Sequence, residues 1–435
     1  MRSSILKYFS LTVIGWYLFL CTVHYFNQRP LWNDEECVFQ SVRNFSAFKM
    51  FNESLDSLQV FPRVYLFLIQ QFSTQFDFHL LSLRFFPYVA MMSAFFIWIR
   101  LADAHIKDRF LYFVFLLSWP ASVTLIYYSA ELKQYSLDVC LSAILLWFLY
   151  RQAQLALKGV QYRALLCVLP AFVLFSYPAY LFMPLIFWNI LRSSNRLFQN
   201  PDIYIFGFST VLFSGLSYYF DMRLASKIVY SGYGDYFVFT DSIQNFFKTT
   251  QEGINNLFSR WFVESPRFYR KIARVFVFFG LAQMFVSFFQ HIKKDNYKLH
   301  SLHTIAFVLF IELFLLGVFK KYPFTVPRTS LFFCPIVLWL TVEGIGSLLT
   351  FSVLTDWRKS ILGLFSREER SLFWASSEPL LWKRPIKRFH KFLFGTVISF
   401  YIVFLVVVSL GLGRQIFSGD LGAQPTIWKG MRKTN

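Results

Sequence analysis

Long apolar runs alternate with short polar segments along the whole chain. The first run, residues 5–26, reads ILKYFSLTVIGWYLFLCTVHYF. Because a helix needs about 20 apolar residues to cross the core of a bilayer, each such run predicts a transmembrane helix. The runs and their spacing predict about eleven spans. The predicted spans are residues 5–26, 79–102, 110–127, 135–150, 164–177, 179–192, 203–221, 272–290, 299–319, 329–351 and 392–413.

Two segments between predicted spans are too long to be simple turns. Residues 27–78 include the stretch FPRVYLFLIQQF, which is apolar but short and has Pro62 near its start. It therefore predicts a helix that lies in the membrane interface. Residues 222–271 mix aromatic residues, glycine and charge, and predict an amphipathic helix near SIQNFFKTTQEGINNLFSRWF. Both segments fall on the same predicted side of the membrane.

These elements predict an all-α integral membrane fold. It is a polytopic helical bundle with interfacial helices in its first outer loop. Residues 1–351 form the transmembrane domain in this prediction. Residues 352–435 hold a basic cytoplasmic loop, the last transmembrane helix and an outer tail.

The composition supports a membrane protein and changes how the charge is interpreted. Hydrophobic residues make up 56% of the chain and charged residues 15%, against about 25% charged residues in soluble proteins. The net charge is +19, which in a soluble domain would indicate nucleic acid. Here the basic residues flank apolar runs, as in HIKKDNYKLH and WKRPIKRFHK. That placement predicts contact with membrane lipids and no nucleic acid partner.

Basic residues in the short loops predict the orientation. The loops RLADAHIKDR, YRQAQLALKGVQYR and LRSSNR are consistently basic, which places them inside with the N-terminus. The N-terminal run has no small-residue cleavage signature after it, so we expect a retained helix. This orientation leaves the basic stretches RWFVESPRFYRK and FKKYPFTVPR outside, where an anionic ligand would explain them.

An acidic cluster follows the first predicted span directly. The stretch PLWNDEECVF presents Asp34, Glu35 and Glu36 in a row. Charged residues often mark the end of a membrane helix, and that is one interpretation. The other is that these acids face a reaction at the membrane surface.

A second polar cluster begins the fourth predicted span. In YYSAELKQYSLD, Glu131, Gln134, Tyr135 and Asp138 are spaced i, i+3, i+4 and i+7, so on a helix they form one polar stripe. Ionisable groups in a span are costly and usually face a cavity or a partner. Glu131 and Lys133 could instead mark the helix end, but Asp138 lies deeper and favours a cavity.

A third cluster lies at the outer end of a late span. The stretch KKYPFTVPRTSLF combines two lysines, an aromatic–proline turn and Arg328. The fork of donors on an arginine suits a phosphate. The alternative is ordinary snorkelling of basic side chains at a helix end.

Other polar residues carry weaker signals. Glu312 and Glu343 are intramembrane acids with no evident partner, and we expect them to be structural. His300 and His303 lie one turn apart without a third ligand, so they do not predict a metal site. Among the five cysteines only Cys37 lies in a polar stretch, and no pair has metal-ligand spacing.

The order of these clusters resembles the GT-C glycosyltransferases. These polytopic enzymes use a polyprenyl-phosphate sugar as donor and include protein O-mannosyltransferases and lipid A aminoarabinose transferases. The resemblance covers about residues 1–345. It departs from the family pattern at Lys133, where arginine is usual, and at Gln134, where proline is common. The matching residues are the Asp34–Glu35 pair, the interfacial stretch FPRVYLFLIQQF, Arg84 at a span start, Tyr128, Ser129, Glu131, Lys133 and Tyr135 in one motif, and Tyr322, Pro323, Phe324 and Arg328.

The resemblance implies roles for these residues. Asp34 would be the general base that takes the proton of an acceptor hydroxyl as it attacks the anomeric carbon, with Glu35 as a second catalytic carboxylate. Glu35 and Glu131 could bind sugar hydroxyls, or they could hold a divalent cation, Mg²⁺ or Mn²⁺, together with Asp34. Lys133, Arg328, Lys321 and Tyr322 would bind the donor phosphate, and Glu131, Tyr135, Tyr128 and Arg84 would line the substrate cavity.

The implied function is the transfer of one sugar, with inversion, on the outer face of the membrane. The donor would be a polyprenyl-phosphate sugar, and the acceptor a lipid, a glycan or a protein. The implied location is the bacterial inner membrane, with the active site on the periplasmic side. One alternative is a transporter or lipid flippase, although such proteins often have repeated halves that this chain lacks. Another is a ligase-type glycan transferase of a different membrane fold, with residues 222–271 as its long outer loop.

Overall fold

The computed structural model of the chain is helical, and no strand occurs in the residues it describes. This confirms the predicted all-α class. The structure describes residues 2–56, 59–153, 159–193, 199–224, 237–259, 267–294, 299, 301–323, 328–350 and 384–417.

Six helical segments of the described residues are long and apolar enough to cross a membrane. They are Leu6–Phe26, Leu80–His105, Pro201–Met222, Lys271–Gln290, Arg328–Leu348 and Thr396–Phe417. Several such helices are what a membrane protein requires. Four further apolar helices are shorter: Arg109–Ser118, Gly159–Leu174, Ala179–Arg192 and Leu302–Val318.

The predicted number of about eleven spans is not confirmed. The predicted span 110–127 is broken by a turn at 119–122, which contains Pro120, into helices α6 (Arg109–Ser118) and α7 (Val123–Tyr128). Proline lacks the N–H that a continuous helix needs. The predicted span 164–177 likewise changes from α9 (Gly159–Val168) to the 3₁₀ helix η2 (Leu169–Leu174), which has Pro170 in its first turn.

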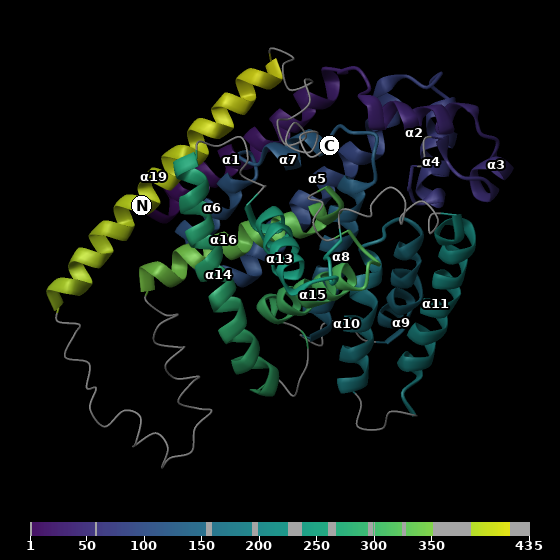
Figure 1. The fold of residues 1–435 in the computed structure, drawn as a ribbon. Coiled ribbons are helices and arrows are strands. Elements are labelled where there is room, and N and C mark those ends of the chain that lie inside the picture. The colour runs from purple at the N-terminus through teal and green to yellow at the C-terminus, as the bar shows by residue number, and fades with distance from the viewer. Residues whose placement is uncertain are drawn as a thin grey trace.

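The first helix leads into three short helices gathered at one end of the bundle (Figure 1). Helix α4 starts directly after Pro62, as the sequence predicts, and buries Leu66 and Ile69 on its inner face. Leu66 packs with Val38, Leu83 and other apolar side chains in a small separate core. The helices are α1 (Arg2–Phe26), α2 (Asn33–Asn44), α3 (Ala47–Asn52) and α4 (Arg63–Thr74).

The larger core lies among the long helices. Helices α5 (Leu80–His105) and α8 (Tyr135–Ala153) pack side by side in its centre. Buried Trp98, Trp119 and Trp339 fill this core. The other helices around it are α10 (Ala179–Arg192), α11 (Pro201–Ser217) with its π-helical end η4 (Tyr218–Met222), α13 (Ile243–Ser259), α14 (Arg267–Lys294), α15 (Leu302–Val318), the 3₁₀ helix η7 (Arg328–Phe333) and α16 (Cys334–Thr350).

Two glycines allow α14 and α16 to approach closely. A Cβ atom on Gly280 would lie 1.9 Å from the Leu340 carbonyl oxygen, and one on Gly344 would lie 1.9 Å from the Phe276 carbonyl oxygen. Small residues at helix–helix contacts let backbones pack closely where lipid supplies no hydrophobic drive. Helix α15 gives Glu343 of α16 a partner, since His303 Nε2 lies 3.7 Å from its carboxylate.

The last described helix, α19 (Arg384–Phe417), contains the predicted span 392–413 and runs along the edge of the bundle beside α1 (Figure 1). Trp16 Nε1 donates to Ser409 Oγ at 2.7 Å and joins the two helices. Helix α13 falls within the predicted amphipathic stretch. The structure does not describe residues 352–383 of the predicted cytoplasmic loop, the tail 418–435, His300, Phe324 and much of 222–271.

Candidate functional site

Three segments that are far apart in the sequence meet at one end of the bundle. They are the start of α2, the hairpin between α7 and α8, and the start of η7. The backbone N–H of Leu132 donates to Glu35 Oε1 at 2.7 Å, which joins the hairpin to α2. The Arg328 guanidinium donates to the Asp34 carboxylate, which joins η7 to α2. The structure therefore brings together the three clusters that the sequence singled out.

Asp34 lies in the first turn of α2, where the helix dipole favours a carboxylate. Its side chain is 23% exposed, and Oδ2 accepts a hydrogen bond from Arg328 Nη1. The neighbouring Lys133 feels the negative charge of Asp34. The accessible Asp34 carboxylate can accept a hydrogen bond from a hydroxyl group, and the two neighbouring cations, Arg328 and Lys133, can bind an anion.

Glu35 is buried, and both of its carboxylate oxygens accept hydrogen bonds. Its carboxylate accepts hydrogen bonds from Arg29 Nη1 at 2.6 Å, from Arg84 Nη2 at 3.0 Å and Nε at 3.1 Å, and from the Leu132 backbone at 2.7 Å. It also reaches back to the Trp32 backbone N–H at 3.4 Å. Two arginines and two backbone donors leave Glu35 little capacity for a ligand. It holds the start of α2 in place and is a positioning residue.

Glu131 is 1% exposed and lies in the hairpin before α8. Its Oε1 accepts from Trp32 Nε1 at 3.2 Å, while Oε2 has no hydrogen-bond partner in the described part of the chain. Burial, together with the charge of Glu35, raises the pKa of Glu131 to about 8. The raised pKa favours the protonated form of this carboxyl group, which opposes its use as a ligand for a cation.

Lys133 lies two residues further along the hairpin and is 4% exposed. Its Nζ donates to Gln59 Oε1 at 2.6 Å. Burial lowers the pKa of Lys133 to about 8, and the charge of Asp34 acts in the opposite direction. This ammonium group therefore carries its charge at neutral pH and loses it in mildly alkaline solution.

The three acids expected to hold a divalent cation do not form a suitable site. Within the described residues, no group of three or more His, Cys, Asp or Glu side chains is arranged to hold a metal ion. Glu35 is occupied by arginines, and the raised pKa of Glu131 opposes ionisation. The expectation of Mg²⁺ or Mn²⁺ on Asp34, Glu35 and Glu131 does not fit this geometry, so no chemical step is assigned to a metal.

A cavity of about 390 Å³ is lined by Lys133 and by Thr329, the neighbour of Arg328, whereas Asp34 and Arg328 are not part of its lining. Lys133 lies on one wall, and Lys320 and Lys321 line it from the end of α15. Tyr135, expected to line the substrate cavity, and Tyr322, expected to bind the donor phosphate, also line it. The cavity thus combines three cations with aromatic surface, which suits an anionic ligand that carries an apolar or ring-shaped group.

The turn after α15 positions the two exposed lysines. Lys320 has a left-handed backbone, with φ +55°. The Lys321 N–H donates to the Leu316 carbonyl at 2.8 Å, and the Lys320 N–H donates to the Gly317 carbonyl at 3.2 Å. This is the Schellman pattern of a helix C-terminus, in which glycine usually takes the left-handed position. A lysine at this position is strained, and strain of this kind is concentrated at functional sites.

Three expected cavity residues lie behind its wall. Arg84 is bound to Glu35, and its Nη1 donates to the Arg29 carbonyl at 2.6 Å. Tyr128 is 4% exposed and packs edge-on against Tyr135, with ring centroids 5.2 Å apart. Glu131 is also outside the lining of the cavity. These three residues therefore support the cavity wall and do not face the cavity. Tyr322 does line the cavity, and its hydroxyl donates to the Thr329 carbonyl at 2.5 Å.

Sequence reasoning did not identify several residues that shape the site. Arg29 follows the first span and was inconspicuous among other helix-end basics, but it pairs with Glu35 at 2.6 Å. Gln59, which holds Lys133, lies in an irregular segment that carries no signal in the sequence. In the sequence Lys320 is one of two adjacent lysines, and its left-handed backbone is visible only in the fold.

A second buried cluster fixes the interfacial helix to the bundle. Arg63, the first residue of α4, lies 3.7 Å from Asp221 and donates to the Met50 carbonyl at 2.8 Å. Tyr177 donates to the other oxygen of Asp221 at 2.5 Å. Because Asp221 lies in the π-helical end of α11, this cluster joins α4 to that helix. Because Tyr177 lines the cavity, this cluster also fixes that part of the cavity wall.

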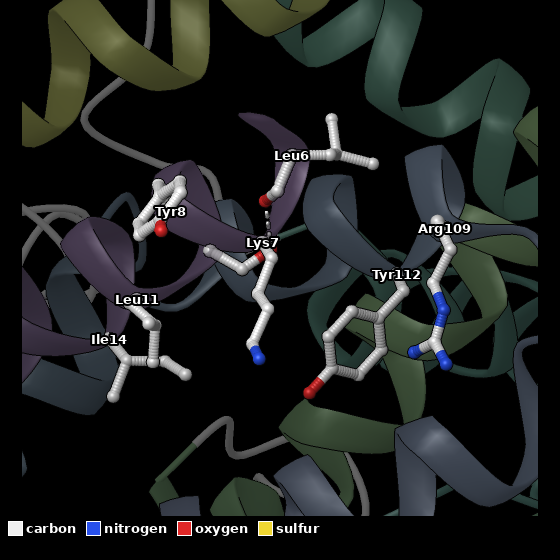
Figure 2. Close-up of a pocket in the computed structure, with 8 residues that line it drawn as sticks. Leu6, Lys7, Tyr8, Leu11, Ile14, Arg109 and Tyr112 are labelled. Carbon is white, nitrogen blue, oxygen red and sulfur yellow. Dashed lines mark hydrogen bonds between the residues drawn. The ribbon is translucent and has the colours of Figure 1, made fainter. Parts of the chain in front are cut away.

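A separate recess lies between α1 and α6 (Figure 2). Its volume is about 660 Å³, and its lining combines Lys7, Arg109 and Tyr112 with apolar side chains of α1. In Figure 2 the Lys7 ammonium and the Tyr112 hydroxyl project into the same space. None of the described residues that line it carries a carboxylate.

No protein-family model, curated protein or solved structure matches the chain. The functional argument therefore depends on the residues of the site and on their geometry.

Proposed function

We propose that this chain is a membrane glycosyltransferase that moves one sugar from a polyprenyl-phosphate donor to an acceptor hydroxyl, with inversion at the anomeric carbon. The observation that carries the proposal is the placement of Asp34. It is an accessible carboxylate that contacts Arg328 and lies beside Lys133, next to a cavity with two further lysines. A base and a phosphate-binding site are thus adjacent, as a displacement of this kind requires.

In the proposed reaction, Asp34 accepts the proton of the acceptor hydroxyl as its oxygen attacks the anomeric carbon. The bond between that carbon and the phosphate oxygen breaks, and the phosphate leaves with the bonding electrons. A phosphate monoester has a second pKa of about 6, so it departs without a general acid. The chain supplies positive charge to stabilise it, through Arg328, Lys133, Lys320 and Lys321.

Arg328 links the two halves of the reaction. Its guanidinium contacts Asp34. An arginine has five donors in a planar fork, so one edge can bind a phosphate while the other still orients the carboxylate. We assign to Arg328 this shared role, and to Tyr322 the support of the adjacent turn.

The proposed location is the bacterial inner membrane with the site on the periplasmic side. The support is the basic character of the short loops on the opposite side and the clustering of the acids at one end of the bundle. The acceptor is a lipid, a glycan or a protein that offers a hydroxyl group to this face.

The test uses purified chain in nanodiscs with radiolabelled undecaprenyl phosphate that carries one sugar. Release of undecaprenyl phosphate, together with transfer of the label to an added acceptor or to water, is the expected result. Movement of the intact labelled lipid between leaflets without cleavage would instead identify a lipid transporter. Transfer of a preassembled glycan and no single sugar would identify a ligase-type transferase.

A further inference from the structure

The recess between α1 and α6 is charged at one end and apolar at the other. Lys7 of α1 and Arg109, the first residue of α6, both line it (Figure 2). Leu11 and Ile14 follow Lys7 along α1, so the lining reaches about 10 Å further along the helix axis. Its volume of about 660 Å³ is within the range of sites that hold a small molecule. The recess therefore suits a ligand with a polar head and an apolar tail.

The charged end lies where α1 would enter a membrane. Lys7 is the second residue of Leu6–Phe26, a segment long and apolar enough to cross a bilayer. A basic side chain at the end of such a segment reaches the level of the lipid headgroups. Leu11 is 55% exposed, and in a spanning helix that surface faces the hydrocarbon. A lipid that enters the recess from the bilayer thus has its head beside Lys7 and its chains beside Leu11.

The charges around the recess are mainly positive. Arg109 Nη1 donates to Asp103 Oδ1 at 2.8 Å, but both side chains of this pair are exposed. An exposed pair of this kind contributes little free energy, so an anionic ligand can compete with Asp103 for the guanidinium. Arg100, near the end of α5, lies close enough for its charge to act on Tyr112 in the lining. Lys7, Arg100 and Arg109 together therefore outweigh Asp103.

The recess is a fixed feature that does not depend on an open helix end. Asp108 caps α6, because its Oδ1 accepts hydrogen bonds from the backbone N–H groups of Phe110 and Leu111. Phe9 of α1 packs edge-on against Phe113 of α6, with ring centroids 6.4 Å apart, and joins the two helices. The cations that remain for a ligand are therefore side chains held on two packed helices.

The recess and the candidate functional site lie at opposite ends of α1. Asp34 follows the C-terminal end of this helix, whereas Lys7 is near its start. The rise from Lys7 to Phe26 is about 30 Å, which is the thickness of a bilayer core. A ligand in the recess therefore does not compete with a ligand beside Asp34.

We propose that this recess binds one phospholipid with an anionic headgroup, of the phosphatidylglycerol type, from the leaflet opposite Asp34. The Lys7 ammonium and the Arg109 guanidinium bind the phosphate, and the Tyr112 hydroxyl donates to it. The acyl chains lie along Leu11. In the predicted orientation this is the cytoplasmic leaflet, where basic pockets between transmembrane helices bind anionic headgroups. The inference is independent of the proposed function, since it requires only that the helices cross a membrane.

The experiment compares two phospholipids with the same acyl chains and different headgroup charge. Purified chain in neutral detergent is titrated with phosphatidylglycerol or with phosphatidylcholine, and bound lipid is counted by native mass spectrometry. We expect the wild type to bind phosphatidylglycerol at least about fivefold more tightly. Lys7→Gln and Arg109→Gln should each weaken its binding by about fivefold and leave phosphatidylcholine within about twofold of wild type.

Asp103→Asn gives a change of the opposite sign. It removes the carboxylate that competes for Arg109, so binding of phosphatidylglycerol should tighten by about two- to fivefold. The matched controls come from another exposed pair, in which Arg163 Nε lies 3.2 Å from Asp202 Oδ1 and neither residue lines the recess. Arg163→Gln and Asp202→Asn change the net charge equally and should leave the binding of both lipids within about twofold of wild type.

Three results would overturn the inference. The first is equal affinity of the wild type for the two lipids. The second is an effect of Arg163→Gln as large as that of Lys7→Gln, which would assign the preference to general surface charge. The third is displacement of phosphatidylglycerol by an equal concentration of glycerol 3-phosphate, which would show that the recess takes a free anion and no lipid. None of these readouts depends on sugar transfer, so they leave the proposed function untouched.

Discussion

The Asp34 carboxylate accepts a hydrogen bond from the guanidinium of Arg328, across 294 positions of the chain. Neither side chain is fully buried, since Asp34 is 23% exposed and Arg328 is 16% exposed. The pair therefore differs from the sealed contact between Glu35 and Arg84 directly behind it, where both side chains are at most 1% exposed. Asp34 is therefore accessible to a substrate, whereas Glu35 is buried and stabilises the fold.

Asp34→Asn should keep the fold and remove most of the transfer activity. Asparagine has nearly the same shape but cannot accept a proton, and loss of a general base lowers the rate by about 10² to 10⁴. The measurement is kcat for sugar release from the labelled donor. Glu36→Gln is the matched control, because Glu36 is exposed in the same helical turn and contacts Gln40. Wild-type kcat in folded Asp34→Asn protein would show that Asp34 is only a helix-end charge.

Arg328→Ala should lower kcat and raise the KM for the donor, and Arg328→Lys should retain partial activity. The leaving phosphate gains charge as its bond to the sugar breaks, so an arginine that contacts it acts in the transition state as well as in binding. A lysine restores the charge but not the fork of donors. Arg163→Ala, at an exposed position beside Asp202, is the control. Normal kcat and KM in Arg328→Ala would remove Arg328 from the site.

Glu35→Ala should destabilise the protein strongly. Arg29 and Arg84 would then be left buried without their shared partner, and breaking a buried ion pair in this way costs about 3–5 kcal/mol. The expected readout is a large drop in the thermal unfolding midpoint in detergent. Glu53→Ala, which breaks an exposed pair with Lys49, is the comparison and should change it little. Equal effects of the two substitutions would contradict the positioning role of Glu35.

Donor binding should weaken as the pH rises through about 8, where Lys133 loses its charge. Burial lowers the pKa of Lys133, so its ammonium form is present below that pH and the neutral form above it. The charges of Asp34, Glu35, Glu131 and Arg328 all act on this group. We expect the KM for the donor to rise by up to about tenfold per pH unit above this point.

Lys133→Arg is the variant that tests the origin of this pH dependence. A guanidinium group stays charged throughout the range, so the alkaline rise in KM should disappear. A rise of unchanged size in Lys133→Arg protein would assign the titration to another group.

Lys320→Gly should stabilise the protein and weaken its binding of the donor. Lys320 has φ +55°, and a left-handed backbone costs a non-glycine residue about 1–2 kcal/mol. Glycine removes this cost and also removes one cation from the cavity. We therefore expect a higher unfolding midpoint together with a higher KM for the donor. Lys321→Gln removes charge without relieving strain, so it should raise KM alone, and a stabilised variant with unchanged KM would exclude Lys320 from the site.

The sequence by itself determined that the chain is helical and apolar enough to cross a membrane. Helix hydrogen bonds are local, and in an apolar medium they are obligatory, so run length and composition are sufficient to predict them. The same local pattern failed in the predicted span 110–127, where a turn containing Pro120 separates α6 from α7. The length and hydropathy of an apolar run do not reveal such a break, although Pro120 is a local signal for it. Four of the apolar helices are also shorter than a full span, and the predicted number of spans was not confirmed.

The sequence also singled out the three clusters that contain Asp34, Lys133 and Arg328, because ionisable groups are conspicuous beside apolar runs. Only the tertiary structure decided how they are used. Asp34 and Glu35 are adjacent acids that no local rule distinguishes, yet Glu35 is enclosed by Arg29, Arg84 and the Leu132 backbone while Asp34 stays accessible. These contacts join segments far apart in the chain, and such contacts depend on how the helices pack rather than on any local pattern.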